Sequence, residues 1–224
     1  MSDLHGSLIP TSEFHPCEVV FICGDISPLN IQANDRKMKR WLAGTFKPWC
    51  EALPCKKVYF IAGNHDWVCL RDDDFMRTVF PPDEKVTYLC QSKALFVSED
   101  GKEYSIFGTP YCKQFCNWAF MEEDEVLSQL YLAIPDKVDI LLTHDQPYGY
   151  GDIILQHTYW NTGENLGNKP LLEAVLMRQP KYMFCGHLHT STHDCVNINT
   201  TKRYNVSIKD ESYEVIYEPL YLEI

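Results

Sequence analysis

Four short apolar segments of this sequence each end in residue types that bind metal ions, and this pattern restricts the folds open to the chain. Residues 19–23 run into Gly24-Asp25, residues 58–62 into Gly63-Asn64-His65-Asp66, residues 140–143 into His144, and residues 182–185 into Gly186-His187-Leu188-His189. Short apolar runs of this kind predict buried strands. Because ligands gather at the carboxyl ends of strands in α/β sheets, we expect the four junctions to meet at one site.

Helical segments alternate with the predicted strands. The patterns predict helices at residues 34–53, 72–80, 122–133 and 170–178, and further strands at 86–90, 94–97, 103–107, 202–208, 213–217 and 220–224. This alternation is typical of α/β and α+β proteins. The 224 residues show no repeat, linker or low-complexity tract, so we expect a single domain that spans residues 1–224.

The charge balance narrows the classes of binding partner. Asp and Glu outnumber Lys and Arg by 31 to 20, which gives a formal net charge of −11. Duplex nucleic acid is therefore not an expected partner, because Lys and Arg make the phosphate contacts that dominate such binding. A small anionic substrate is compatible with this charge, since bound metal ions can supply positive charge locally.

Neither a membrane nor an oxidising compartment is expected from the sequence. No apolar run approaches the roughly 20 residues that span a bilayer, and the first residues lack the basic and apolar stretches of a secretory signal. Ten cysteines are spread along the chain without a Cys-x-x-Cys pair. This spacing favours reduced thiols in a cytoplasmic protein over a disulfide framework.

The residue types at the four junctions are those of a metal site. Together with Asp3-Leu4-His5 near the start of the chain, they provide carboxylates, imidazoles and one carboxamide. This donor set suits two divalent ions of intermediate softness, such as manganese, iron or zinc. Each element alone has an ordinary alternative, because a Gly-Asp pair is often a turn and a histidine after a strand is often structural. The prediction depends on the combination of all five.

In this order, the five elements resemble the calcineurin-like metallophosphoesterase superfamily, whose motifs are Asp-x-His, Gly-Asp, Gly-Asn-His-(Asp/Glu), His and Gly-His-x-His. They extend from Asp3 to His189 and so cover nearly the whole chain. Within the superfamily, the stretches VDILLTHDQP and LLEAVLMRQPKYMFCGHLH resemble the small single-domain metallophosphodiesterase branch, as do Asn205-Val206-Ser207 and Glu218-Pro219-Leu220.

The resemblance implies a four-layer α-β-β-α sandwich with a dinuclear metal centre at its strand ends. In this family pattern, Asp3, His5, Asp25 and His189 hold one ion, and Asn64, His144, His187 and the shared Asp25 hold the other. Two such ions (Mn²⁺, Fe²⁺/Fe³⁺ or Zn²⁺) polarise the phosphoryl oxygens and lower the pKa of a bridging water, which attacks phosphorus in line with the leaving group. The implied activity is metal-dependent hydrolysis of a phosphoester, as a phosphodiesterase or phosphatase.

His65 follows the predicted ligand Asn64 and has a separate implied role. By resemblance, its imidazolium points at the leaving oxygen, where it stabilises or protonates the developing negative charge. The alternative for His65 is a further metal ligand or structural support. The neighbouring Asp66 is expected to support the structure rather than to act in catalysis.

The chain departs from the family pattern in two places. Family members carry an apolar strand before Asp-x-His, whereas only Met1 and Ser2 precede Asp3 here. We therefore expect a frayed N-terminus and weakened binding of the ion held by Asp3, His5 and His189, because chain ends are poorly ordered unless they are tied down. The second departure follows Gly24-Asp25, where this chain lacks the Val-Asp-Arg-Gly continuation of protein phosphatases, so protein dephosphorylation is not expected.

The sequence indicates less about the substrate than about the metal site. The connection from residue 145 to residue 169 is long and rich in aromatic residues, and loops of this kind are often functional. We expect Tyr148, Tyr150 or Trp160 to stack on the base of a small nucleotide phosphodiester. The alternative is a loop folded on itself or packed at a homo-oligomer interface. Two alternative functions stay open. One is a nuclease of the same superfamily, and the other is a non-catalytic scaffold with the same fold, such as the retromer subunit.

Overall fold

Two β-sheets form the centre of the molecule. The computed structural model describes residues 1–82, 84–154 and 163–224. One sheet is parallel, with the order β1-β2-β3, and consists of β1 (Val19–Cys23), β2 (Lys57–Ile61) and β3 (Val86–Tyr88). The other has the order β10-β11-β9-β8-β5-β4 and consists of β4 (Ser92–Val97), β5 (Glu103–Thr109), β8 (Ile140–Thr143), β9 (Tyr182–Cys185), β10 (Val196–Ile198) and β11 (Thr201–Asn205). A small pair, β6 (Cys112–Lys113) and β7 (Met121–Glu122), lies apart from both sheets.

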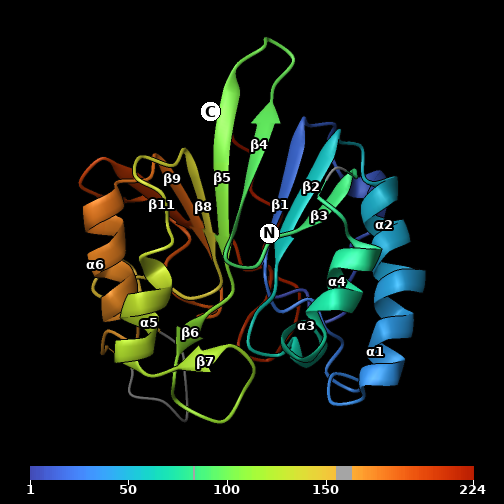
Figure 1. The fold of residues 1–224 in the computed structure, drawn as a ribbon, viewed down its shortest axis with the longest axis horizontal. Helices are drawn as coiled ribbons and strands as arrows, with labels where there is room; N and C mark the ends of the chain where they lie inside the picture. The colour runs from blue at the N-terminus through green and yellow to red at the C-terminus, as the bar shows by residue number, and fades with distance from the viewer. Residues whose placement is uncertain (83, 155–162) are drawn as a thin grey trace.

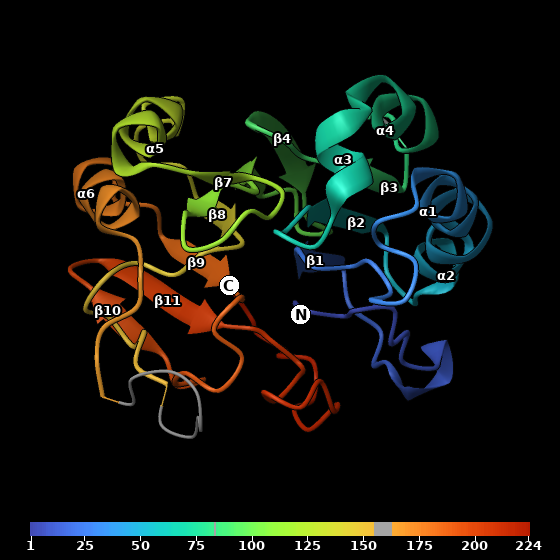
Figure 2. The same ribbon diagram turned by 90° about the horizontal axis from the view of Figure 1, so that it is seen from below.

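Helices cover the outer face of each sheet, as Figures 1 and 2 show. Beside the three-stranded sheet lie α1 (Asp35–Trp41), the π-helical segment η2 (Leu42–Phe46), α2 (Lys47–Ala52), α3 (Trp67–Arg71) and α4 (Asp73–Val79). Beside the six-stranded sheet lie α5 (Asp124–Tyr131) and α6 (Lys169–Arg178), and a short 3₁₀ turn, η1 (Thr11–Glu13), precedes β1. The helix-sheet-sheet-helix order confirms the four-layer α-β-β-α architecture.

Three apolar clusters hold these layers together. One joins the first group of helices to the three-stranded sheet, and a second joins α5 and α6 to the six-stranded sheet. The third lies between the two sheets and includes Ile61 of β2, Ile106 of β5 and Leu142 of β8. Strands β2 and β8 are therefore covered on both faces, which explains why they read as continuous apolar runs.

Three side chains mark where helices begin, and each accepts a hydrogen bond from a backbone N–H of the first turn. Asn34 accepts from Lys37 N at 3.0 Å, Asp72 from Phe75 N at 3.0 Å, and Asn168 from Leu171 N at 2.9 Å. Such caps satisfy donors that the helix itself leaves unpaired. They agree with the predicted helix starts near residues 34, 72 and 170.

The N-terminus is not frayed, so that expectation was wrong. Asp3 N donates to Gly24 O at 3.0 Å, and Ile208 N donates to Ser2 O at 3.1 Å. Ser2 and Asp3 are fully buried. The first residues thus lie between the end of β1 and the segment after β11, and backbone hydrogen bonds from both sides hold them in place.

The predicted strands at 213–217 and 220–224 are also absent from the structure. Among the described residues, those after β11 are held mainly by single contacts, such as the bridge between Lys209 and Val215 and the bond from Tyr104 Oη to Ile224 O at 2.6 Å. Strand β11 already has β10 on one side and β9 on the other, so the tail cannot pair with the strand that it follows.

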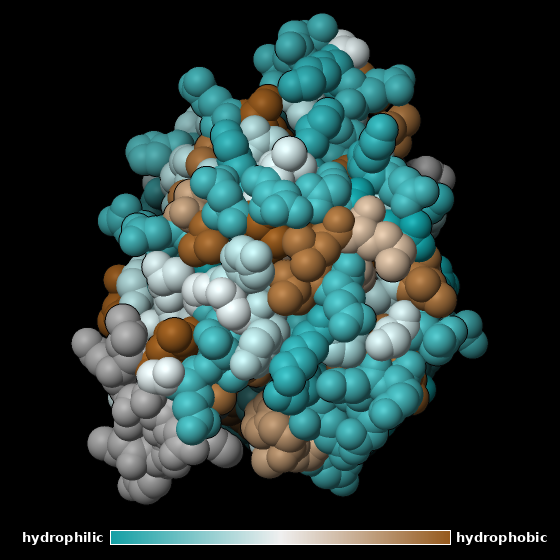
Figure 3. Space-filling view, turned by 90° about the vertical axis from the view of Figure 1, so that its left-hand side faces the viewer, coloured by the Kyte–Doolittle hydropathy of each residue, from teal (hydrophilic) through white to brown (hydrophobic). Residues whose placement is uncertain are grey.

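The surface over α5 and α6 carries separate apolar side chains among polar ones, as Figure 3 shows. Val126, Leu132, Leu176 and Met177 are the exposed large apolar residues in or next to these helices. Single exposed apolar residues are normal on protein surfaces, and the homo-oligomer interface stays a prediction. Within the described parts of the chain, none of the helices has the length and apolar character needed to cross a bilayer.

Candidate metal centre

Asp25 lies at the centre of a group of imidazoles. The residue follows β1, and its Oδ2 atom is 3.3 Å from His144 Nε2, 3.6 Å from His5 Nε2 and 3.9 Å from His65 Nε2. Its other oxygen accepts a hydrogen bond from His65 N at 2.8 Å. These residues come from four segments distant in sequence, which meet at the lower end of the sandwich in Figure 1 and face the viewer in Figure 2. This confirms that the junctions converge.

Asp3 provides a second carboxylate next to the first group. Its Oδ1 atom is 3.6 Å from His189 Nε2, and both its oxygens accept from His187 N at 3.2 Å. Two buried sets of three side chains have ligand atoms within 4.8 Å of one another and could each hold an ion. These sets are Asp3, His5 and His189, and Asp3, Asp25 and His144. The first lies within the set that the resemblance assigned to one ion.

Two of the predicted ligands lie beside these sets rather than inside them. Asn64 Oδ1 is 3.0 Å from His144 Nε2, and the His187 ring is 5.1 Å from the His144 ring, centroid to centroid. All seven predicted ligands are thus neighbours at one end of the fold, with Asn64 and His187 on the His144 side.

Backbone carbonyls fix which ring nitrogens face the carboxylates. His144 Nδ1 is 2.8 Å from Cys23 O, and His189 Nδ1 is 2.9 Å from Asp210 O. A carbonyl oxygen only accepts, so each Nδ1 carries the hydrogen and each Nε2 is left to bind a cation. His5 is buried, and within the described part of the chain neither of its ring nitrogens has a hydrogen-bond partner. Buried polar atoms are rarely left unpaired, so a bound cation fits this residue well.

The electrostatics of the group also favour cations. Burial by itself would lower the pKa of His144, but the adjacent Asp25 carboxylate outweighs burial and raises that pKa to about 10. The same competition between burial and Asp3 raises the pKa of His189 to about 9. Burial would raise the pKa of Asp25, yet His144 and His65 hold it well below its usual range. Without metal, the protonated imidazoles of His144 and His189 therefore balance the charge of the ionised carboxylates, and a divalent cation would compete with the protons on these imidazoles.

Backbone strain is concentrated in the same residues. Asp3, His5, Asp25 and His187 have φ values of 58°, 44°, 51° and 67°, in the left-handed region that side chains other than glycine seldom adopt. They account for four of the ten such non-glycine residues in the described chain. Strained backbone conformations persist where the surroundings enforce them, and they cluster at functional sites. The clustering supports a binding role for this end of the fold.

Two glycines permit the close approach of the ligand loops. A Cβ atom on Gly63 would lie 2.6 Å from Asp25 N and 2.7 Å from His144 Cε1. A Cβ atom on Gly186 would lie 2.5 Å from Asp3 Oδ2. Only glycine fits at these positions without moving a predicted ligand, which explains the glycines before Asn64 and His187.

Comparison with known proteins decides the family. Residues 1–191 match the family model described as calcineurin-like phosphoesterase. The chain belongs to this family. Membership confirms the resemblance seen in the five motifs, and it supports metal-dependent phosphoester hydrolysis as the general activity.

Relatives of this chain include proteins of animals. A UPF0046 protein of Caenorhabditis elegans is 27% identical over 245 residues, and the match covers 98% of this chain and 58% of that protein. Human metallophosphoesterase domain-containing protein 1 is 24% identical over 244 residues, which cover 100% of this chain and 69% of that protein. The chain therefore spans little more than half the length of the nematode relative.

Solved structures share the fold of this chain at low sequence identity. One structure has a TM-score of 0.62 and 13% identity, with 92% of this chain and 84% of the other covered. A Thermus thermophilus protein has a TM-score of 0.53 and 14% identity, with 85% and 77% covered. At such identities the likeness concerns the fold alone.

Asp66 joins the loop after β1 to the loop after β2. Its carboxylate accepts from Ser27 N at 2.9 Å, Gly63 N at 2.8 Å and Ile26 N at 3.2 Å. Because Asp66 is fully buried and its oxygens are occupied by these donors, it holds the loop after β1 against the loop after β2.

A buried polar network that the motifs did not indicate supports the loop with His187 and His189. Gln146 Nε2 donates to Gly186 O at 2.7 Å, and Asn205 Nδ2 donates to Leu188 O at 3.0 Å. The fully buried Arg203 donates to Gln146 Oε1 and, at 3.0 Å, to Thr192 O. Gln146 lies within the stretch VDILLTHDQP and Asn205 begins Asn205-Val206-Ser207, so both belong to stretches that carry the family resemblance, although the resemblance assigned neither residue a role.

A cavity of about 320 Å³ opens beside the predicted ligands. Its lining includes His65, His187, Lys113, Phe115, Trp118 and Tyr213. The Trp118 ring is 4.5 Å from the His65 ring, Phe115 is 5.7 Å from His187, and Tyr213 is 4.8 Å from His5, all measured between ring centroids. Sequence reasoning missed these aromatic residues, because they lie in irregular segments without a motif.

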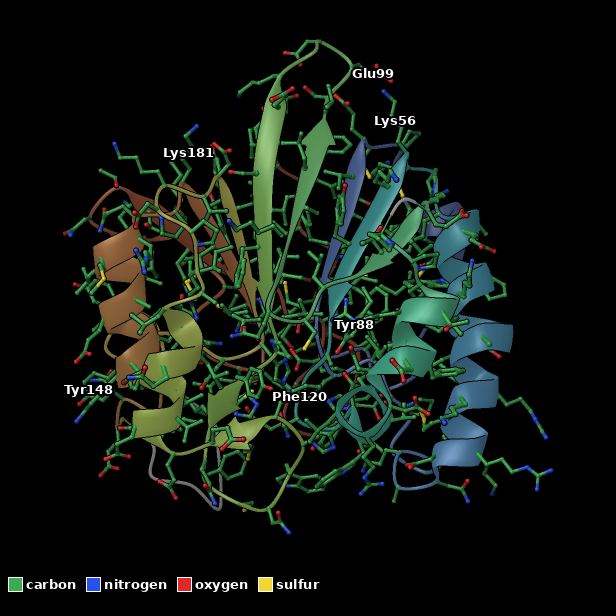
Figure 4. All side chains as sticks on the ribbon, in the orientation of Figure 1. Lys56, Tyr88, Glu99, Phe120, Tyr148 and Lys181 are labelled. Carbon is green, nitrogen blue, oxygen red and sulfur yellow. The ribbon has the colours of Figure 1, made fainter. Side chains whose placement is uncertain are left out.

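Two of the three aromatic residues predicted to bind substrate, Tyr148 and Tyr150, lie elsewhere. Tyr148 and Tyr150 are not among the described residues that line this cavity. Tyr148 stacks under Lys169 Nζ, which is 5.0 Å from its ring, at the outer edge of the molecule beside α6 (Figure 4). Tyr150 packs against the core cluster of α5 and α6. Trp160 lies outside the described residues.

Proposed function

We propose that this protein hydrolyses a small phosphoester through a dinuclear metal centre at the end of the sandwich. The observation that carries the proposal is the convergence of two carboxylates and three imidazoles, whose ligand atoms form two sets within 4.8 Å of one another. Asp25 is the proposed bridging ligand, since one of its oxygens faces three imidazoles. Manganese, iron and zinc all suit these donors.

The proposed division of ligands follows the motif order. One ion is held by Asp3, His5, Asp25 and His189, and the other by Asn64, His144, His187 and Asp25. When bound, two divalent ions lower the pKa of a water molecule and neutralise charge on a phosphoryl group. The chain's part is to hold each imidazole in the correct tautomer and to keep Asp3 and Asp25 ionised.

His65 is the proposed proton donor. Its ring lines the cavity, and its Nε2 atom is 3.9 Å from Asp25 Oδ2. A phosphoester seated next to Asp25 would therefore bring its leaving oxygen near this nitrogen. Protonation of the leaving oxygen by a positioned side chain contributes about 10²–10⁴-fold in rate.

The proposed substrate is a small phosphodiester, with a nucleotide ester as the favoured class. A cavity of about 320 Å³ is at the small end of the range for ligand sites, which argues for one nucleotide rather than a polymer. Phe115 and Trp118 offer planar surfaces for a base. Lys113 is the one Lys or Arg among the described lining residues, and it can pair with an anion. Phe115 and Trp118 replace Tyr148 and Tyr150 in this proposal.

Hydrolysis of bis-p-nitrophenyl phosphate with added manganese, iron or zinc tests the activity. Turnover is expected in the wild type and is expected to be lost in His144→Ala, whereas His15→Ala, an exposed histidine away from the cavity, is the matched control. Absence of turnover with all three metals would contradict the proposal and favour a scaffold with this fold.

The substrate class has its own test. Adenosine monophosphate and ribose 5-phosphate differ only in the base, so their inhibition constants isolate its contribution. Stacking on a base is worth about 1–3 kcal/mol, and the nucleotide is expected to inhibit more strongly by a corresponding factor. Phe115→Leu and Trp118→Leu should reduce that ratio, while equal inhibition by both compounds in the wild type would contradict a base-binding role.

A further inference from the structure

Three partners hold the His65 side chain and backbone in place, and only one of them, Asp25, is a predicted metal ligand. His65 Nδ1 is 2.7 Å from Gln32 Oε1, and Trp118 packs against the ring with a 36° angle between the planes. The backbone N of His65 donates to Asp25 Oδ1. Trp118 therefore packs on the ring of His65, Gln32 contacts its Nδ1 atom, and Asp25 binds its backbone N–H.

The chemistry of the Gln32 side chain determines the state of the ring. A carboxamide oxygen only accepts hydrogen bonds, so the Nδ1 atom of His65 must carry the hydrogen. Nε2 is then the nitrogen that faces Asp25 and the cavity. A proton carried by Nε2 points towards the place where the leaving oxygen is expected.

Gln32 itself sits on a loop with defined backbone geometry. Gln32 N donates to Pro28 O at 3.0 Å, and Asn34 N donates to Ile31 O at 2.8 Å. Asn34 then caps α1. The turn and the cap hold the loop between β1 and α1, and the half-buried Gln32 side chain extends from it to His65.

We propose that Gln32 is a positioning residue for acid catalysis, which orients His65 so that Nε2 delivers its proton to the leaving oxygen. The inference rests on the proposed function. The two can be tested separately, because acid assistance matters most for a poor leaving group, whereas metal-assisted attack is required for every phosphoester.

A matched pair of diesters tests this role. Diphenyl phosphate and bis-p-nitrophenyl phosphate have nearly the same shape, but phenoxide needs a proton on departure far more than p-nitrophenoxide does. Gln32→Met removes the acceptor at similar side-chain length and is expected to lower kcat on diphenyl phosphate about 10-fold or more, with little change on the nitrophenyl ester. Gln32→Glu restores an acceptor oxygen and should recover most of the loss. Gln129→Met, in exposed helix α5, is the control.

A double variant completes the test. Because Gln32 acts through His65, adding Gln32→Met to His65→Ala should cause no further loss on either ester. Equal losses on both esters in Gln32→Met, or additive losses in the double variant, would overturn the inference while leaving the proposed function intact. Lack of turnover of both esters by the metal-loaded wild type would overturn the proposed function and this inference together.

A separate observation concerns two cysteines at the opposite end of the sandwich. Strands β1 and β2 pair in register with Val19 opposite Lys57, and the same offset places Cys17 opposite Cys55. Cys17 N donates to Pro54 O at 3.1 Å, which continues the pairing of the two segments beyond the strand ends. Adjacent strands lie about 4.8 Å apart, which is within the Cα separation of about 4.4–6.8 Å that a disulfide requires.

We infer that Cys17 and Cys55 form a reversible disulfide through exchange with a small disulfide such as oxidised glutathione. The Cys17 thiolate attacks one sulfur of glutathione disulfide, forms a mixed disulfide and releases one glutathione thiolate. The Cys55 thiolate then attacks the Cys17 sulfur and releases the second glutathione thiolate. The two thiol protons pass to the released glutathione, so the protein is oxidised by two electrons and the glutathione disulfide is reduced.

Burial and spacing favour this pair over the other cysteines. Five of the ten are buried, namely Cys23, Cys50, Cys69, Cys112 and Cys185. Cys17, Cys55 and Cys90 are half-buried, so a small disulfide can reach all three, but the strand register places only Cys17 and Cys55 opposite each other. Cys116 and Cys195 are more exposed, but the structure pairs neither of them with another thiol.

Differential alkylation followed by peptide mass spectrometry tests the inference. After incubation of the full chain with oxidised glutathione, Cys17 and Cys55 are expected to be the first cysteines protected, in one linked peptide pair that reductant separates. Cys55→Ser should instead leave glutathione on Cys17, and the exposed Cys116→Ser should leave the linkage unchanged. A first disulfide between other cysteines, or glutathione retained on wild-type Cys17 without closure, would overturn the inference.

Discussion

The two ends of the sandwich are built from the same strands and differ in almost every other respect. At the carboxyl ends of β1, β2, β8 and β9, the backbone turns through left-handed conformations, and buried carboxylates face imidazoles. At the other end a larger cavity of about 620 Å³ is lined by residues such as Phe21, Phe184 and Leu220. The exposed ion pair of Lys56 and Glu99, labelled in Figure 4, also lies there. The smaller cavity, and not the larger one, is therefore the one beside the strained backbone and the convergent ligand types.

The largest difference between the two ends is expected in the rate of hydrolysis when one carboxylate is neutralised at each end. Asp25→Asn removes the charge that faces three imidazoles, and we expect hydrolysis of bis-p-nitrophenyl phosphate to fall about 10³-fold or more. Glu99→Gln, at the opposite end, should leave the rate unchanged. Equal effects of the two substitutions on kcat/KM would remove the functional distinction between the ends.

Packing around the ligand loops should give the next largest effect. In Gly63→Ala the added Cβ would overlap Asp25 N and the His144 ring, so we expect a loss of about 1–3 kcal/mol in the free energy of unfolding, together with weaker metal binding. The Cβ of Gly44→Ala, in contrast, would meet no atom within 4 Å. Urea unfolding of both variants checks this, and a Gly63→Ala variant as stable as the wild type would contradict the close packing.

A smaller effect than these is expected from the polar network that supports the loop with His187 and His189, and it concerns metal affinity. Asn205→Ala removes the donor to Leu188 O, and we expect metal affinity to fall about 10–100-fold while the fold is retained. Calorimetric titration with manganese measures the change. Asn197→Ala, which changes an exposed side chain of strand β10, is the control, and equal affinities of the two variants would show that the network does not position the ligands.

The smallest effect is expected at the exposed ion pair. Lys56→Ala breaks the 2.8 Å contact with Glu99, but exposed pairs contribute little because water and salt screen them. Neither the midpoint of urea unfolding nor the rate of hydrolysis should change measurably. A loss of activity in this variant would show that the two ends are coupled.

Much of the fold could be predicted because its signals are local. Strands such as β2 are buried on both faces and appear as apolar runs, and helix starts such as Asn34 carry capping residues. The proximity of the candidate metal ligands could be predicted for a related reason, since most of them directly follow strands that end at the same edge of the fold. The N-terminus was misjudged because its stability depends on Ile208, a partner about two hundred residues away that no local pattern reveals.

The aromatic residues that line the cavity could not be predicted from the sequence for the same physical reason. Trp118 and Tyr213 approach the histidines only through tertiary packing, and neither belongs to a periodic segment. Tyr148 and Tyr150 sit in a long aromatic loop that looked functional, yet one lies at the outer edge and the other packs into a core. Aromatic content alone does not indicate which face a loop presents.

Metal content tests the central claim most directly. After equilibrium dialysis against manganese, elemental analysis of the wild type should give two ions per chain, and Asp25→Asn should bind fewer than two. A wild type that binds one ion or none, or an Asp25→Asn variant with undiminished content, would contradict the dinuclear centre.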